Sequence, residues 1–192
     1  MLTKTTIKQI ASLRQQKFRK ELGLFVVEGR KITKELLQSD FKTVGLYATE
    51  AFLADYPTFS KAEVVSEMQM EQMSGQDTPP GILAAVKIPH QCEIKPSSRL
   101  ILALDGITNP GNMGTLIRTA EWFGIHDVVC SNDCIELWNP KTVQATMGSL
   151  FRMKVWRTDL ANYLQQAKAE GKAIYGALLE GENLFKMQAQ PE

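Results

Sequence analysis

The run LILALDGI at residues 100–107 is almost continuously apolar, and the loop TNPGN that follows it is polar and contains proline and glycine. An uninterrupted apolar run indicates a strand buried on both faces, which occurs mainly in parallel sheets covered by helices. We expect a helix from about Met113 to Phe123. A buried strand that leads through a short loop into a helix places this part of the chain in the α/β class, because parallel strands need crossover connections.

The same alternation continues toward the C-terminus. We expect a second buried strand in residues 124–132, a helix and a strand within 139–157, an amphipathic helix in 158–172 and an apolar strand in 173–180. Thr158 or Asp159 is suited to cap the amphipathic helix, and Gly171 is suited to end it. This order predicts a mostly parallel sheet whose binding loops lie at the carboxyl ends of the strands.

The N-terminal half also alternates between strands and helices. We expect helices in residues 4–20, 30–40 and 68–74, and strands near 22–29, 43–50, 62–67 and 81–88. Met68, Met70 and Met73 are expected to fill gaps in a core. The polar segment at residues 90–99, with one proline and two serines, reads as an interdomain linker.

Composition excludes several classes of protein. Hydrophobic residues make up 44% of the 192 residues and charged residues 22%, which is typical of a globular protein. No apolar run approaches the roughly 20 residues of a membrane span, and the basic N-terminus lacks the apolar core of a secretory signal. Three cysteines are too few for a disulfide scaffold, and reduced thiols favour a cytoplasmic location.

Charge is distributed unevenly along the chain. Residues 1–42 contain ten Lys or Arg and four Asp or Glu, a net charge of +6, whereas the remaining residues carry a net charge of −5. A basic N-terminal region suggests a polyanionic partner such as nucleic acid. A solvated, lysine-rich helix face explains the same pattern equally well.

The loop after the apolar run has features that suit an anionic ligand. Gly106, Gly111 and Gly114 allow close approach of a ligand to the backbone, and the helix that follows offers free N–H groups at its start. Arg118 lies about one turn into that helix, where a guanidinium can bind a phosphate through two hydrogen bonds. Asn109 and Asn112 can orient a hydroxyl or an amide. A tight strand-to-helix turn with a surface arginine is the alternative.

Other candidate sites are weaker. Cys130 and Cys134 lie four residues apart without a second pair, and His90 and His126 are separated in sequence. Because zinc sites need four convergent ligands, we expect no metal. A dinucleotide fingerprint, a Walker lysine and a nucleophile-elbow serine are all absent from the sequence.

The stretch NPGNMGTLIRTAEWFG resembles the first signature of the SpoU-type, TrmH-like RNA ribose methyltransferases of the SPOUT superfamily. The matching positions are Asn112, Gly114, Arg118, Thr119, Ala120, Phe123 and Gly124. ATMGSLFRMKV resembles the next conserved stretch through Met147, Gly148, Phe151 and Arg152, although Lys154 stands where the family commonly has proline. In the N-terminal half, FVVEGRKITKELL and SGQDTPPGILAAV are similar to the family's small substrate-binding domain.

The resemblance implies two domains. Residues 1–90 would form a ribosomal-protein-like α/β domain that binds RNA, residues 91–98 a linker, and residues 99–192 a SPOUT parallel-sheet domain with a trefoil knot. In the family, a Gly-x-Glu-x-x-Gly loop and a Ser-Leu-Asn run build the knot and most of the cofactor pocket. The sequence ends at Glu192 before both, which favours a C-terminally truncated chain over a protein that lacks the pocket.

The implied activity is transfer of a methyl group from S-adenosylmethionine to a ribose 2′-hydroxyl of structured RNA, with ribosomal RNA favoured over transfer RNA. By this resemblance Arg118 is the catalytic arginine and Asn112 orients it or the ribose. We favour a phosphate-binding and alkoxide-stabilising role for Arg118 over a role as base, because the pKa of arginine exceeds about 12. Met147, Gly148 and Leu178 are the expected cofactor contacts.

The expected RNA contacts lie in the basic N-terminal region, at Arg14, Lys17, Arg19, Lys20, Arg30 and Lys31. The family also implies a homodimer, and the absence of a long apolar run gives no reason to expect a membrane partner. An RNA-binding protein of the same fold without catalysis is the alternative. A small-molecule α/β enzyme would leave the basic region unexplained.

Overall fold

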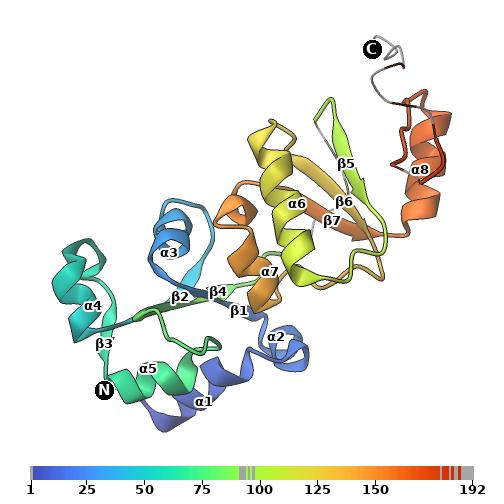
Figure 1. The fold of residues 1–192 in the computed structure, drawn as a ribbon. Coiled ribbons are helices and arrows are strands. Elements are labelled where there is room, and N and C mark those ends of the chain that lie inside the picture. The colour runs from blue at the N-terminus through green and yellow to red at the C-terminus, as the bar shows by residue number, and fades with distance from the viewer. Residues whose placement is uncertain are drawn as a thin grey trace.

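The structure is a computed structural model that describes residues 2–90, 94, 96, 98–177, 179–181, 183 and 186. It contains a four-stranded sheet in the N-terminal half and a three-stranded sheet in the C-terminal half (Figure 1). The N-terminal elements are α1 (Lys4–Ser12), α2 (Gln16–Leu22), β1 (Leu24–Glu28), α3 (Arg30–Leu37), β2 (Thr43–Thr49), α4 (Glu50–Asp55), η1 (Pro57–Phe59), β3 (Glu63–Val65), α5 (Glu67–Met73) and β4 (Ile82–Lys87). The C-terminal elements are β5 (Ile101–Leu104), α6 (Pro110–Trp122), β6 (Asp127–Ser131), α7 (Pro140–Ala145), η2 (Ser149–Phe151), β7 (Lys154–Thr158) and α8 (Leu160–Ala169).

The N-terminal sheet has the strand order β1-β4-β2-β3, in which β2 and β3 are parallel and the other pairs are antiparallel. Side chains alternate between its two faces, as the pleat of a strand requires. Val26 of β1 packs with α1 and α5 on one face, where Met70 and Met73 fill the core as expected. Met68 is exposed and takes no part in that core.

The opposite face of the N-terminal sheet is completed by residues from the C-terminal half. Phe25 and Val27 of β1 pack with α3 and also with a group from α7 and η2, namely Val143, Leu150 and Phe151. In Figure 1, α7 accordingly lies beside β1, at the junction of the two sheets. The two halves therefore share one apolar core, which the expectation of a linker between separate domains did not include.

The C-terminal sheet has the order β5-β6-β7, and both strand pairs are parallel, as the sequence predicted. Val128 and Cys130 of β6 face α6, whereas Val129 faces α8. Helices on both faces explain why β6 is buried along its whole length. Asp159 caps α8 through the backbone N–H of Asn162, again as expected.

Three expected elements differ in the structure. The helix expected at residues 4–20 is broken into α1 and α2, because Leu13 is fully buried beneath the break. The strand β5 is only partly buried, since it lies at the edge of its sheet and exposes Ala103. The strand expected at 173–180 is absent from residues 173–177, which are described and exposed, because an apolar run becomes a strand only where a neighbouring strand accepts its hydrogen bonds. The trefoil knot stays an expectation.

Gly114 of α6 lies against α7 at very short range. A Cβ built on Gly114 would lie 2.5 Å from the Cβ of Ala145 and 2.8 Å from the carbonyl oxygen of Thr142. The Thr142 oxygen belongs to the backbone, so it cannot move aside as a flexible side chain can. The spacing between α6 and α7 therefore depends on glycine at this position.

We predict that Gly114→Ala lowers the free energy of unfolding by about 1–3 kcal/mol, because the methyl group overpacks the α6–α7 contact. Denaturant-induced unfolding would measure the loss. The matched control is Thr115→Ala, one residue later on the exposed side of the same helix, which should change stability by less than about 0.5 kcal/mol. If Gly114→Ala lowers the free energy of unfolding as little as the control does, the contact between α6 and α7 tolerates a methyl group.

Candidate functional site

The carboxyl ends of β5 and β6 lie next to each other, and the loops that follow them are fastened together. The backbone N–H of Gly106 donates to the hydroxyl of Ser131 at 2.9 Å. The N–H of Ile135 donates to the carbonyl of Ile107 at 2.7 Å, and the N–H of Ile107 lies 3.3 Å from the sulfur of Cys134. The loop at residues 105–109 is therefore held by the segment at residues 132–139, and its conformation does not depend on glycine freedom alone.

Most residues of the stretch NPGNMGTLIRTA serve the structure of α6. Asn109 caps the helix by accepting a hydrogen bond from the N–H of Asn112 at 3.0 Å, and Pro110 occupies the first turn, where its missing N–H costs nothing. Gly114 allows the contact with α7. Met113, Ile117 and Ala120 lie in the core of the C-terminal half. Structure accounts for these residues, but it does not account for the exposed polar ones.

Arg118 is exposed on α6 and, among the described residues, forms no hydrogen bond or ion pair. It does not line either of the two cavities described below. Asn112 is exposed as well, at the other border of the same face of the helix, roughly a third of the circumference away by helix geometry. No contact between the described atoms joins the two side chains, so Asn112 does not orient Arg118 here.

The three expected cofactor contacts have different outcomes. Met147 is 40% exposed and has φ = 52°, a left-handed conformation that is rare for residues other than glycine. Gly148 is buried with φ = 98°, and a Cβ there would lie 2.7 Å from the Cγ of Glu35. The structure thus places Gly148 against a side chain of α3, and its expected contact with the cofactor stays a prediction. Leu178 lies outside the described residues.

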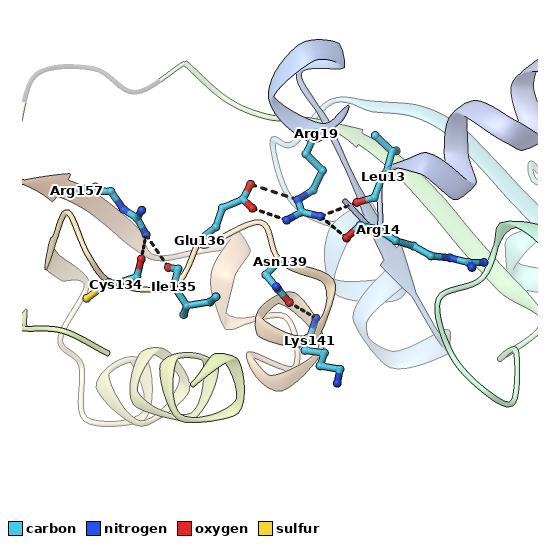
Figure 2. Close-up of polar contacts among 9 residues, drawn as sticks. All are labelled: Leu13, Arg14, Arg19, Cys134, Ile135, Glu136, Asn139, Lys141 and Arg157. Atoms are coloured by element: carbon cyan, nitrogen blue, oxygen red, sulfur yellow. Dashed lines mark hydrogen bonds and ion pairs between the residues drawn. The ribbon is translucent and has the colours of Figure 1, made fainter. Parts of the chain in front are cut away.

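Arg19 departs most clearly from its expected role in RNA binding. Its side chain is buried, with the residue 1% exposed, and its guanidinium donates to Glu136 and to the carbonyls of Leu13 and Arg14 (Figure 2). The two carbonyls belong to the break between α1 and α2. All of these donors are directed into the protein, so this arginine does not face a phosphate. Because Arg19 lies in a basic stretch of the sequence, nothing near it predicted that Glu136 would be its buried partner.

The other five cations expected to bind RNA are exposed. Arg14 donates to the carbonyls of Gln72 and Ser74, and Arg30 stacks on the ring of Tyr56 at 4.5 Å. Lys17 and Lys20 extend from α2, whereas Arg30 and Lys31 begin α3. Four of these exposed cations therefore lie on α2 and α3, and Arg14 lies in the break between α1 and α2.

A cleft of about 930 Å³ lies between α2 and the C-terminal half. Lys20 from α2 lines one side, and Trp138, Trp156 and Arg157 line the other. Arg157 donates to the carbonyls of Cys134 and Ile135, so it fastens the segment 132–139 to β7 (Figure 2). A second cavity of about 570 Å³ lies near the end of α6, lined by residues including Phe123, His126 and Arg152.

A second polar contact between the two halves was not foreseen from the sequence. Arg152, after η2, forms ion pairs with Glu35 of α3 and with Glu121 of α6. Burial by itself would raise the pKa of the Glu121 carboxyl, but hydrogen bonds from Arg152 and Ser149 lower it below its usual value. Hydrogen bonding to Glu121 correspondingly raises the pKa of Arg152. The three charged groups connect α3 to the helix that carries Arg118.

The cysteines are structural in this arrangement. Cys130 and Cys134 are free and buried, and burial raises the pKa of the Cys130 thiol to about 12. A protonated, enclosed thiol is a poor nucleophile and a poor metal ligand. The described part of the chain holds no group of three or more His, Cys, Asp or Glu residues suited to a metal ion. Within that part, every helix also falls short of the length and apolarity that a bilayer crossing requires.

Comparison with protein families matches both halves of the chain. The SpoU rRNA methylase family matches residues 99–192, and the MRM3-like substrate binding domain matches residues 4–84. The chain is 30% identical to the 23S rRNA (guanosine(2553)-2′-O)-methyltransferase RlmP of Bacillus subtilis, over 91% of this chain and 70% of the relative. It is 27% identical to the mitochondrial rRNA methyltransferase 3 of Homo sapiens, over 79% of this chain but only 40% of that protein.

Solved structures agree with these matches. A protein of Porphyromonas gingivalis that is assigned to the TrmH family of RNA methyltransferases superposes with a TM-score of 0.86 and 34% identity, over 99% of this chain and 76% of that one. An AdoMet-bound rRNA methyltransferase from Sinorhizobium meliloti superposes with a TM-score of 0.72 and 27% identity, over 88% of this chain and 67% of that one. Fold, motif positions and sequence relatives therefore agree, and the chain belongs to the SpoU rRNA methylase family of RNA methyltransferases, within the SPOUT superfamily.

Proposed function

We propose that this protein transfers a methyl group from S-adenosylmethionine to the 2′-hydroxyl of a ribose in ribosomal RNA. One observation carries the proposal. In the matched motif on α6, capping, helix contact and core packing account for Asn109, Pro110, Gly114 and the buried apolar residues, but they do not account for the exposed side chains of Arg118 and Asn112. A cation that the fold does not use is available to a substrate.

The described residues supply only part of a cofactor site. Met147 offers an exposed apolar side chain on a strained backbone, and such backbone conformations occur often at ligand sites. Gly148 has no room for a side chain beside Glu35, and its backbone remains an expected cofactor contact. S-adenosylmethionine supplies an activated methyl group when it is bound. Its assignment here rests on the family and on the AdoMet-bound relative, and not on a pocket of this structure.

Arg118 would act on the RNA. A guanidinium keeps its proton at any physiological pH, so it is a poor base. Its planar fork suits the phosphate next to the reacting ribose, which it would hold through two hydrogen bonds while its charge stabilises the developing alkoxide. Asn112 lies on the same exposed face of α6. Its side-chain amide would form a hydrogen bond with the ribose, and it would not form one with Arg118. Correct positioning of two reacting groups alone lowers a barrier by roughly 7–11 kcal/mol.

Ribosomal RNA is the favoured substrate over transfer RNA because the named relatives are rRNA methyltransferases and the N-terminal half matches a substrate-binding domain. Exposed Lys17, Lys20 and Lys31 offer cations to its backbone. A cytoplasmic location agrees with the free thiols of Cys130 and Cys134. The non-catalytic RNA-binding alternative is less favoured, since it leaves Arg118 without a role.

We also propose that two copies associate through the exposed face of α6. Trp122, the last residue of this helix, and Phe123, its C-cap, are 86% and 75% exposed. Large exposed aromatic side chains next to a functional cation are typical of surfaces that a partner covers. A second copy seated there would bring Arg118 close to residues of its partner.

We predict that Arg118→Ala reduces methyl transfer by at least about a hundredfold, because the group that stabilises the transition state is removed. RNA affinity should change by less than about threefold, because many other phosphate contacts remain. Transfer of a labelled methyl group would report the rate, and filter binding would report affinity.

Arg118→Lys separates charge from geometry. Lysine keeps the charge but loses the planar fork, so we expect partial activity at most. Lys168→Ala, an exposed lysine on α8, is the matched control and should leave the rate unchanged. Full turnover by Arg118→Ala would remove Arg118 from the mechanism.

RNA affinity should fall steeply as salt concentration rises, because bound lysines release counterions. We predict that Lys17→Ala/Lys20→Ala lowers the slope of log affinity against log salt by about 0.7–0.9 for each phosphate that the variant no longer neutralises. Arg30→Ala/Lys31→Ala tests the start of α3 in the same way. A slope that neither pair changes would exclude α2 and α3 from the RNA interface.

We predict that sedimentation of the full chain shows a dimer and that Trp122→Glu shifts it toward a monomer, because burying the introduced charge at the interface is costly. Leu179→Glu, another exposed apolar position outside α6, is the control. A wild-type chain that sediments as a monomer at micromolar concentration would argue against this interface.

A further inference from the structure

The polar contact between Arg19 and Glu136 joins two segments that lie 117 positions apart in the sequence. The Nε of Arg19 donates to one carboxylate oxygen at 3.2 Å, and its Nη2 pairs with the other. Both side chains are enclosed, with exposed fractions of 2% and 11%. A buried arginine with a two-point carboxylate partner is a rare arrangement, since removing both charges from water is costly.

The same guanidinium also holds the N-terminal half from within. Its Nη1 donates to the carbonyls of Leu13 at 2.7 Å and Arg14 at 2.9 Å. These carbonyls are freed where the chain breaks between α1 and α2, and the guanidinium satisfies them. The arginine thus fixes the angle of α2 and binds the other half with its remaining donors, as Figure 2 shows.

Glu136 is held equally firmly on its own side. It lies in the segment 132–139, which Arg157 fastens to β7 and which in turn fastens the loop before α6. The next helix, α7, packs on α6 at Gly114 and on β1 of the N-terminal half. A continuous series of contacts therefore leads from Arg19 to the helix that carries Arg118.

We propose that the Arg19–Glu136 pair is an interdomain latch that positions RNA, bound by the N-terminal half, relative to Arg118. This inference rests on the proposed methyl transfer. The packed core holds the two halves together, and the two-point ion pair adds a fixed distance and angle between α2 and the segment 132–139. Arg19 is a positioning residue: it touches neither RNA nor cofactor.

The informative variant removes both charges together, as Arg19→Met/Glu136→Leu. Removing one partner alone would leave an unpaired buried charge and destabilise the fold. An apolar pair of similar volume avoids that cost and leaves only the carbonyls of Leu13 and Arg14 without their donor. The matched control is Glu170→Leu/Lys172→Met, which removes an exposed ion pair within the C-terminal half. Arg19→Lys, which keeps the charge but loses the fork, tests the latch should the double variant fail to fold.

The full chain would be studied by small-angle X-ray scattering and by single-turnover methylation of ribosomal RNA. For the double variant we expect a larger radius of gyration and a rate at saturating RNA that is about ten- to a hundredfold lower, since displaced reacting groups are slow to react. RNA affinity and its salt slope should stay within twofold. Arg19→Lys should recover part of the rate, and the control pair should match the wild type.

Three results would overturn the latch. An unchanged scattering curve would show that the pair does not hold the halves together. A loosened protein with an unchanged rate would show that their geometry does not position RNA. A weaker affinity with a reduced salt slope would show that Arg19 contacts RNA directly. If the wild type itself transfers no methyl group, the proposed function fails, while scattering still tests whether the pair fixes the two halves.

Discussion

The packing of α7 and η2 on the N-terminal sheet is the contact on which the arrangement of this protein depends. Phe25 and Val27 of β1 present an apolar face that α3 alone does not cover, and Val143, Leu150 and Phe151 complete it. The ring of Trp138 lies tilted against that of Phe25 with centroids 4.7 Å apart, and the ring of Phe151 meets that of Phe41 edge-on at 5.2 Å. A half that finishes its core with residues of the other half cannot turn freely on a linker.

The close packing of these elements explains why Gly114 and Gly148 stand in the two motifs that resemble the family. Gly114 lets α6 approach α7, and Gly148 lets the chain approach Glu35 of α3. The first contact lies within the C-terminal half, and the second joins that half to α3 of the N-terminal half. Residues that a motif search assigns to a ligand site thus set the spacing of the elements that carry the site. Arg118, the proposed functional cation, is exposed on the same helix as Gly114.

Local patterns predicted individual elements well and their environment less well. The apolar runs at β1, β4 and β6 and the cap at Asp159 were predicted because alternation and capping act over a few residues, whereas the cap at Asn109 was not predicted. The break between α1 and α2 was not predicted from the sequence. Helical spacing continues through it, and it forms because Leu13 is buried there while Arg19 satisfies the freed carbonyls.

By itself the sequence determined the α/β class, the parallel C-terminal sheet and the motif that places Arg118 on an exposed helix, because hydrophobic periodicity and motif spacing are properties of consecutive residues. Only the tertiary structure decided which cations face solvent and which face inward. Arg19 and Lys20 are neighbours in one basic run, yet the first is buried against Glu136 and the second is exposed. The direction of a side chain on a helix depends on what packs against that helix, and here the partner lies more than a hundred residues away in the chain.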